Sequence, residues 1–288
     1  MIAENEITKY TLDSKTAVGK VTLGVANLEM MTDFYTELIG LTVQDQGASV
    51  VELGVDDIPL LRLEARPNGR QYPNATGLYH FALLLPSREE LGQWLTHLSA
   101  NNYSLTGASD HLVSEALYLN DPEGNGTEVY RDRPRSEWHY ESGQIQMATI
   151  RLNLQALLAD AKPAPFTQLP SGTIMGHIHL QVNDVTKNAQ FYADLVGFES
   201  MLLWPEAAFL AAGGYHHHLG MNIWHSRGAS SASEGSLGLL RYEIRLPDAQ
   251  QTDSLVARLD AMDVPIIHTD EGPSIMDPSG NLAVLTAQ

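Results

Sequence analysis

The apolar positions of this chain recur in a fixed order of strand, helix and short strands. Residues 18–26 and 77–85 are both apolar runs typical of buried strands, and a helical pattern follows each of them. After the second helical pattern, β-rich runs at 116–119 and 127–130 flank the turn DPEGN. The pattern therefore predicts a unit of one strand, one helix and three further strands.

The two halves of the chain are similar to each other. A Phe-Tyr pair at 34–35 closes an amphipathic stretch, and another at 191–192 does the same, an offset of 157 residues. The turns DPEGN at 121–125 and DPSGN at 277–281 repeat at an offset of 156. Helix packing and a tight turn account for these elements, so they indicate fold and not chemistry.

Four copies of the βαβββ unit, which we call modules one to four, can be placed on the sequence. Their ranges are 18–65, 77–132, 173–226 and 238–287. The predicted class is α+β, with two open barrel-like domains of two modules each, at 18–132 and 173–288. Residues 133–172, rich in proline and polar residues, are the expected linker between them.

Length and charge narrow the classes of function. A chain of 288 residues is long enough for two domains with sizeable cores. Its 17 Lys and Arg against 35 Asp and Glu give a formal net charge of −18. Such a charge repels a phosphate backbone and an anionic membrane surface alike, so we expect neither nucleic acid nor membrane as a partner.

Cysteine usage and hydropathy limit the metal chemistry and the compartment. Without any cysteine, a metal must bind through His, Asp or Glu, and the chain has 11 histidines. The longest apolar runs fall far short of the roughly 20 residues that span a bilayer. The first residues lack the basic-then-apolar order of an export signal, so we expect a cytoplasmic protein.

Comparison of the modules singles out three candidate metal ligands. We align the opening strands at Thr22, His80, His179 and Arg241, and the closing strands at Glu128, Asn222 and Val284. Only modules two and three offer a histidine in the opening strand, and only module two offers a carboxylate in the closing strand. Because inward-facing positions of neighbouring strands converge, His80, His179 and Glu128 form a candidate set.

Two histidines and one carboxylate form the facial arrangement that leaves open positions on non-haem Fe(II). These ligand types suit Fe(II) or Mn(II), but alone they do not separate these ions from Zn(II) or Ni(II). Taken singly, a histidine in a strand is more often a satisfied core or surface residue. The coincidence of all three at matching positions is what favours ligation.

Two segments carry a specific resemblance. In the first, Asp110, His111, a Leu-Tyr pair ending at Tyr118, a Pro-x-Gly turn and Glu128 follow one another as in type I extradiol ring-cleaving dioxygenases. The second, GGYHHH at 213–218, resembles the paired-histidine strand of the same family. With its four modules, the chain resembles the vicinal-oxygen-chelate superfamily, and within it the bacterial catechol 2,3-dioxygenases of the Bacillus type.

The resemblance implies a role for each matching residue. His80, His179 and Glu128 match the metal ligands, and Tyr118 matches a tyrosine that hydrogen-bonds a substrate oxygen. His218 best matches the acid/base histidine, His216 and His217 compete with it, and His111 matches a histidine at the pocket edge. A histidine can exchange a proton with a catechol near neutral pH. The alternative for 216–218 is a polar turn on a surface hairpin.

The chain departs from the family in one respect. Most extradiol enzymes draw their ligands from modules three and four, whereas Arg241 and Val284 leave module four without a ligand. Modules two and three must then pair, either within one chain or between subunits of a homo-oligomer, and the sequence leaves this open. His177 lies two residues before His179 on the same strand face. It is therefore a candidate for a residue that supports a ligand, or for an alternative ligand.

The function implied by the resemblance is an Fe(II)-dependent dioxygenase, an oxidoreductase of aromatic catabolism. It would open a catechol-type diol with O₂, within walls such as Trp224 and Phe81. Two other readings stay open. One is a glyoxalase I-like isomerase or a thiol transferase, which uses the same module, and the other is a non-catalytic protein that binds small molecules.

Overall fold

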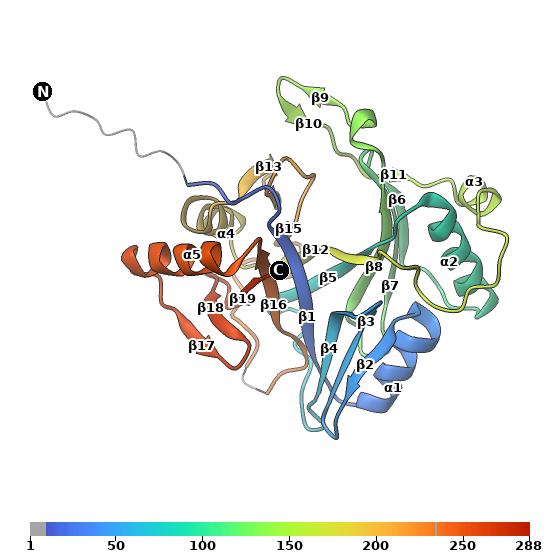
Figure 1. Cartoon of the computed structure of the whole chain (residues 1–288), viewed down its shortest axis with the longest axis horizontal. Coiled ribbons are helices and arrows are strands. Elements are labelled where there is room, and N and C mark those ends of the chain that lie inside the picture. Colours follow the sequence, from blue (N-terminus) through green and yellow to red (C-terminus); the bar gives the residue numbers. More distant parts are fainter. Residues whose placement is uncertain (1–9, 234) are drawn as a thin grey trace, which may run out of the picture.

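The computed structural model describes residues 10–233 and 235–288 and consists of two curved sheets with helices on their outer flanks (Figure 1). The expectation about an export signal concerns residues that lie outside this description. One sheet takes its strands from the first and the last module, and the other takes its strands from the two middle modules and the segment between them. The predicted α+β class, with open, barrel-like curvature, is confirmed.

Modules one and four build an eight-stranded sheet in the order β17-β18-β19-β16-β1-β4-β3-β2. Its strands from module one are β1 (Ala17–Val25), β2 (Thr42–Gln46), β3 (Val50–Val55) and β4 (Ile58–Ala65). Those from module four are β16 (Gly238–Leu246), β17 (Ile267–Thr269), β18 (Gly272–Met276) and β19 (Leu282–Ala287). The two modules join where β1 and β16 pair in antiparallel fashion.

Modules two and three build a nine-stranded sheet in the order β11-β6-β7-β8-β5-β12-β15-β14-β13. Module two gives β5 (Gly77–Leu84), β6 (Gly107–Asp110), β7 (Ser114–Asn120) and β8 (Gly126–Asp132). Module three gives β12 (Ile174–Gln181), β13 (Glu199–Leu203), β14 (Ala207–Ala211) and β15 (Leu219–Asn222). β5 and β12 pair in antiparallel fashion, so modules two and three meet within one chain.

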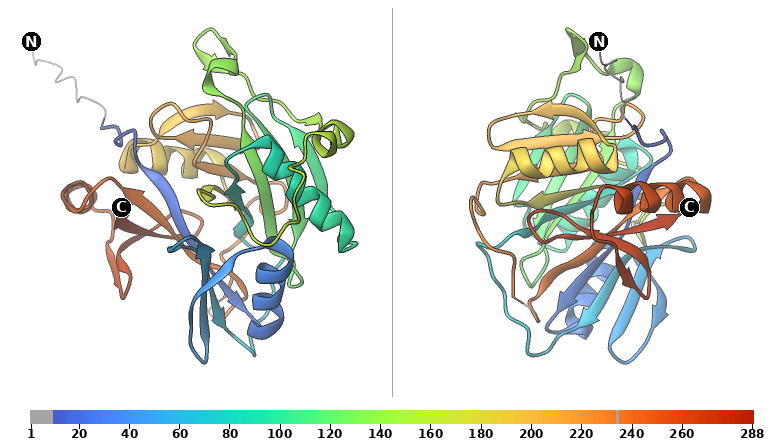
Figure 2. Two further views of the ribbon diagram at one scale, coloured as in Figure 1. Left: turned by 45° about the vertical axis from the view of Figure 1, so that its right-hand side comes forward. Right: turned by 90° about the vertical axis from the view of Figure 1, so that its left-hand side faces the viewer.

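Helix ends follow from local chemistry. The helices are α1 (Leu28–Asp33), η1 (Phe34–Ile39), α2 (Arg88–Ala100), α4 (Val185–Gln190), η3 (Phe191–Val196) and α5 (Ala249–Ala261). Asn27, Ser87, Asp184 and Asp248 cap the four α-helices that follow the opening strands, because each side chain accepts a bond from a free backbone N–H of the first turn. Figure 2, on the right, shows α4 and α5 together on one flank.

The repeated motifs tie each half of the chain together. The Tyr35 hydroxyl donates to Asp121 in the DPEGN turn over 2.7 Å, and Tyr192 donates to Asp277 in the DPSGN turn over 3.1 Å. These bonds join modules one to two and three to four, whereas the sheets join one to four and two to three. The expected domains at 18–132 and 173–288 each combine two modules that follow each other in the sequence. The two sheets combine the modules differently.

The expected linker adds structure to the nine-stranded sheet. It contains η2 (Arg135–Glu137), β9 (Tyr140–Glu141), β10 (Gln144–Ile145), β11 (Ile150–Arg151) and α3 (Leu154–Ala159). β11 pairs with β6 and so extends the edge of the sheet, while α3 packs on α2. Within the described ranges, every helix is too short or too polar to cross a bilayer.

Candidate metal centre and its pocket

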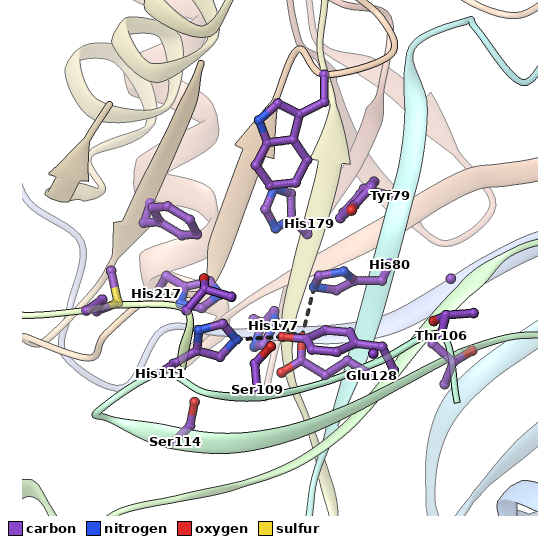
Figure 3. A pocket seen from close by; sticks show the side chains of 18 of the residues that line it. Tyr79, His80, Thr106, Ser109, His111, Ser114, Glu128, His177, His179 and His217 are labelled. Carbon is purple, nitrogen blue, oxygen red and sulfur yellow. Dashed lines mark hydrogen bonds and ion pairs between the residues drawn. The ribbon is translucent and has the colours of Figure 1, made fainter. Parts of the chain in front are cut away.

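Three buried side chains from three strands converge in the nine-stranded sheet. They are His80 on β5, Glu128 on β8 and His177 on β12. The Nε2 atoms of His80 and His177 lie 3.0 Å and 3.2 Å from the same oxygen, Oε2 of Glu128. Figure 3 shows the three side chains pointing toward one another from separate strands.

The arrangement fits a divalent cation. Two ligand atoms at about 2.1 Å from a metal, and at right angles to each other, lie about 3.0 Å apart. In addition, Nε2 of His80 is buried and makes no hydrogen bond in spite of its closeness to Glu128. Buried polar atoms are seldom left unpaired, so this nitrogen points to a missing partner, which a metal ion would supply.

The ionisation of the group favours binding of a cation. Burial lowers the pKa of His177 to about 4, so its ring is neutral at pH 7 and offers a lone pair. For Glu128, burial opposes ionisation, but His177 and His80 outweigh it and hold the pKa well below its ordinary value. A neutral imidazole and a carboxylate are the forms that bind metals.

His179 has a different environment from the one we expected. Its Nε2 accepts a hydrogen bond from the Asn222 side-chain amide over 3.0 Å, and it lies outside the convergent group. Counting back from the helix caps explains why. His80 lies seven residues before Ser87 and His177 seven before Asp184, whereas His179 lies five before Asp184. His177 is thus the counterpart of His80, and this spacing is visible in the sequence.

A pocket of about 520 Å³ opens beside the group. Tyr118 and His111 line it, as expected from the resemblance. The Ala148 carbonyl lies 2.6 Å from Nδ1 of His111 and can only accept, so Nδ1 carries the proton. Nε2 of His111 lies 2.7 Å from the Tyr118 hydroxyl, and the two contacts fix the orientation of both side chains.

Of the three consecutive histidines, His217 lines the pocket, and His216 and His218 do not. Nδ1 of His218 accepts a backbone bond from Ala212 over 3.1 Å. His216 is fully buried, and its Nε2 lies 2.9 Å from the Asp132 carboxylate. The segment therefore lies in the interior of the protein and is not a surface hairpin.

A chain of contacts leads from the pocket to Asp132. Nδ1 of His217 lies 2.7 Å from Nδ1 of His216. A carboxylate can only accept, so His216 donates to Asp132 from Nε2. In the tautomer in which Nδ1 of His216 accepts from Nδ1 of His217, the lone pair of His217 lies on Nε2. Burial lowers the pKa of His217 well below its ordinary value and keeps this ring neutral.

Of the two aromatic residues expected to form walls, Trp224 lines the pocket. Phe81 is fully buried in the core, where its ring centre lies 6.1 Å from that of Tyr35. Tyr79, Trp204 and Phe209 also line the pocket and were not foreseen. Trp204 lies in a loop and Phe209 in a strand. Comparison of the modules assigns no role to the equivalent positions, so no sequence signal singled these two residues out.

Comparison with known proteins gives the family. The model of the Glyoxalase/Bleomycin resistance protein/Dioxygenase superfamily matches residues 17–129 and 174–284. A Bacillus subtilis protein named catechol-2,3-dioxygenase is 39% identical over 274 residues, which are 93% of this chain and 96% of that protein. The expected resemblance to a catechol 2,3-dioxygenase of the Bacillus type is thereby confirmed.

Two solved structures share the fold. One is a Bacillus subtilis protein assigned provisionally to the dioxygenases, with a TM-score of 0.66, 12% identity, and coverage of 96% of this chain and 86% of that one. The other is glyoxalase I from Zea mays, with a TM-score of 0.57, 15% identity, and coverage of 94% and 92%. At such identities they support the fold alone. The chain belongs to the glyoxalase, bleomycin resistance protein and dioxygenase superfamily.

Proposed function

We propose that this protein is an extradiol ring-cleaving dioxygenase, which opens a catechol-type diol with O₂ and places both oxygen atoms in the product. The observation that carries the proposal is the convergence of His80, Glu128 and His177 at the bottom of the pocket. The name of the 39% identical Bacillus subtilis relative supports the same reaction.

We propose His80, Glu128 and His177 as the residues that hold the metal, with Fe(II) as the ion. This set replaces the expected His179 by His177. Of these two histidines, His177 is the one that belongs to the convergent group, with a nitrogen close to Glu128. When bound, a metal of this kind supplies open positions for the substrate and passes electron density from the diol to O₂. The two imidazoles and one carboxylate suit Fe(II) and Mn(II) alike.

The protein's own residues manage position and protons. We propose that His217, and not the expected His218, receives a proton from a diol hydroxyl at Nε2 and later returns it to the leaving oxygen. His216 and Asp132 would hold the ring of His217 in the tautomer that keeps this nitrogen free. Tyr118, held by His111, would place its hydroxyl against a substrate oxygen.

The proposal is tested by loading the protein with Fe(II) without oxygen, then adding catechol and air. A yellow ring-opened product that forms with uptake of one O₂ per diol is the expected result. Absence of product from catechol, alkylcatechols and hydroquinones alike would refute it. If a hemithioacetal were isomerised instead, the glyoxalase I-like alternative would take its place.

A matched pair of variants tests the ligand set. His177→Ala should lose bound metal, whereas His179→Ala should keep it, because the two residues share a strand face and differ in their contact with Glu128. Metal content after gel filtration measures this without any assay of turnover. Retention by His177→Ala together with loss by His179→Ala would restore the set expected from the sequence.

A further inference from the structure

One side of the pocket is a continuous aromatic wall, which we define as Tyr79, His179, Trp204, Phe209 and Trp224. Neighbouring rings are in contact along it. Centroid separations are 5.2 Å for Tyr79 and Trp224, 5.8 Å for His179 and Phe209, and 5.5 Å for Trp204 and Phe209. Figure 3 shows His179 and Tyr79 on one side of His80, with Ser109 and His111 on the other.

The aromatic wall leads from the buried metal-binding group to the surface. His179 is 4% exposed, whereas Trp204 and Trp224 are 42% and 46% exposed. Large indole rings left half open to solvent beside a pocket are costly in the free protein, since their apolar area is removed from water only when something covers it. The opposite side carries the hydroxyls of Thr106, Ser109 and Ser114, so the two sides differ in polarity.

The side chains that line the pocket bear on whether it could accept a substrate with an acidic substituent. Among its lining residues in the part of the chain that the structure describes, none is Lys or Arg. A substrate carboxylate would lose its hydration here without gaining an ion pair with a Lys or Arg side chain.

The size of the pocket exceeds what a bare diol requires. A single ring with two oxygens fills only a small part of about 520 Å³. With its diol beside the group of His80, Glu128 and His177, such a ring would leave Trp204 and Trp224 exposed. The remaining space is bounded on one side by aromatic rings, and a flat or branched hydrocarbon would fill it well.

We propose that the substrate is an uncharged catechol with a bulky apolar substituent, such as an aryl group, and that Trp204 and Trp224 hold this substituent. The inference rests on the proposed function. It adds the class of substrate and two residues that determine specificity. Binding would cover both indoles, so preference for the substituted diol would come from apolar area removed from water.

The first test compares four diols as substrates of the Fe(II)-loaded protein. We expect kcat/KM for 4-phenylcatechol or 3-phenylcatechol to exceed that for catechol by about tenfold or more, the gain expected from burying part of an aryl ring. We expect the value for 3,4-dihydroxybenzoate to be about tenfold lower than that for catechol. Calorimetric titration without O₂ should give the same order of Kd values, with a negative change of heat capacity for the phenyl compounds.

Two variants of the aromatic wall test whether it causes the preference for a phenyl substituent. Trp204→Ala and Trp224→Ala should each reduce the ratio of kcat/KM for the preferred phenylcatechol over catechol by about fivefold to tenfold. Leu203→Ala is the matched control, since Leu203 is 59% exposed, adjoins Trp204 and does not line the pocket. It should leave the ratio unchanged.

The outcomes separate this inference from the proposed function. Turnover of catechol without any advantage of either phenyl compound, or equal use of the carboxylated diol, would overturn the inference and leave the dioxygenase assignment standing. An unchanged ratio in both tryptophan variants would overturn the role of the wall. Failure to turn over or bind any diol would overturn both.

Discussion

The two sheets of this protein place different kinds of side chain at the same fold positions. In the nine-stranded sheet, the position seven residues before the helix cap carries His80 and His177. In the eight-stranded sheet, the residues seven positions before the helix caps Asn27 and Asp248 are Lys20 and Arg241. Imidazole side chains in one sheet are thus replaced by fixed cations in the other.

The closing strands extend the contrast. In the nine-stranded sheet, Glu128 on the closing strand β8 pairs with Ala82 on β5. The equivalent pairs in the eight-stranded sheet are Arg62 with Thr22 and Val284 with Glu243. Around these cations lie four glutamates that have no counterpart in the convergent group. They are Glu52, Glu64, Glu243 and Glu271.

The pairs are close enough to form one network. Nζ of Lys20 lies 3.0 Å from Glu52 and 3.4 Å from Glu271, and Arg241 pairs with both Glu64 and Glu271. In this network the carboxylates are paired with Lys and Arg side chains. The comparison teaches that one backbone can gather either ligands or ion pairs at a sheet junction, and that a few side chains decide which.

The sharpest way to break the comparison is to remove the carboxylate from one sheet and the matching residue from the other. Glu128→Ala should lose metal binding and turnover, by far more than the tenfold to hundredfold typical of residues that only support ligands. Val284→Ala, at the equivalent register position, should retain both. Metal content and product formation measure the pair, and equal losses in the two variants would contradict the asymmetry.

The next effect concerns the histidine that faces the pocket. His217→Asn should lower kcat by about 10²-fold to 10⁴-fold, the usual contribution of general acid–base catalysis, while metal content stays unchanged. His218→Asn serves as the comparison, because His218 is bonded to backbone and does not line the pocket. A larger loss of kcat in His218→Asn would return the acid/base role to that residue.

Strand parity explains which site residues could be predicted. His80 and Glu128 could be assigned because Ser87 and the DPEGN turn fix their strand positions. His177 and His179 lie on one face of β12, so alternation alone does not separate them, and only the distance to the helix cap does. The repeats and the α+β class depend on local patterns and were predictable for the same reason.

Long-range features were beyond local patterns. Which modules share a sheet depends on the pairing of β5 with β12, residues about a hundred positions apart in the chain, and the sequence left two arrangements open. Gly213 and Gly214, just before the three histidines, both have positive φ, of 62° and 64°. After such a left-handed turn, sequence spacing alone does not indicate which of the three histidines faces the pocket.

A smaller effect tests the ion-pair network. Arg241→Met removes a cation but keeps much of the apolar stem, and it leaves Glu64 and Glu271 without their main partner. Because these groups are only partly buried, we expect a loss of about 2 kcal/mol, between the values typical of exposed and buried pairs. Urea unfolding followed by circular dichroism measures it. A variant as stable as the wild type would show that the network contributes no net stability.

The smallest effect is the pH dependence of the difference in unfolding free energy between the wild type and Arg241→Met. Burial raises the pKa of Glu64 and of Glu271, but Arg241 and neighbouring cations outweigh it, so both pKa values lie below the ordinary 4.5. A lowered folded-state pKa stabilises the protein above the ordinary value, and this contribution disappears as the pH falls through the folded pKa. In Arg241→Met the part of this lowering that Arg241 causes is lost. The difference in unfolding free energy between wild type and variant should therefore be largest near pH 7 and shrink below pH 4.5, whereas two parallel curves would mean that these glutamates owe nothing to Arg241.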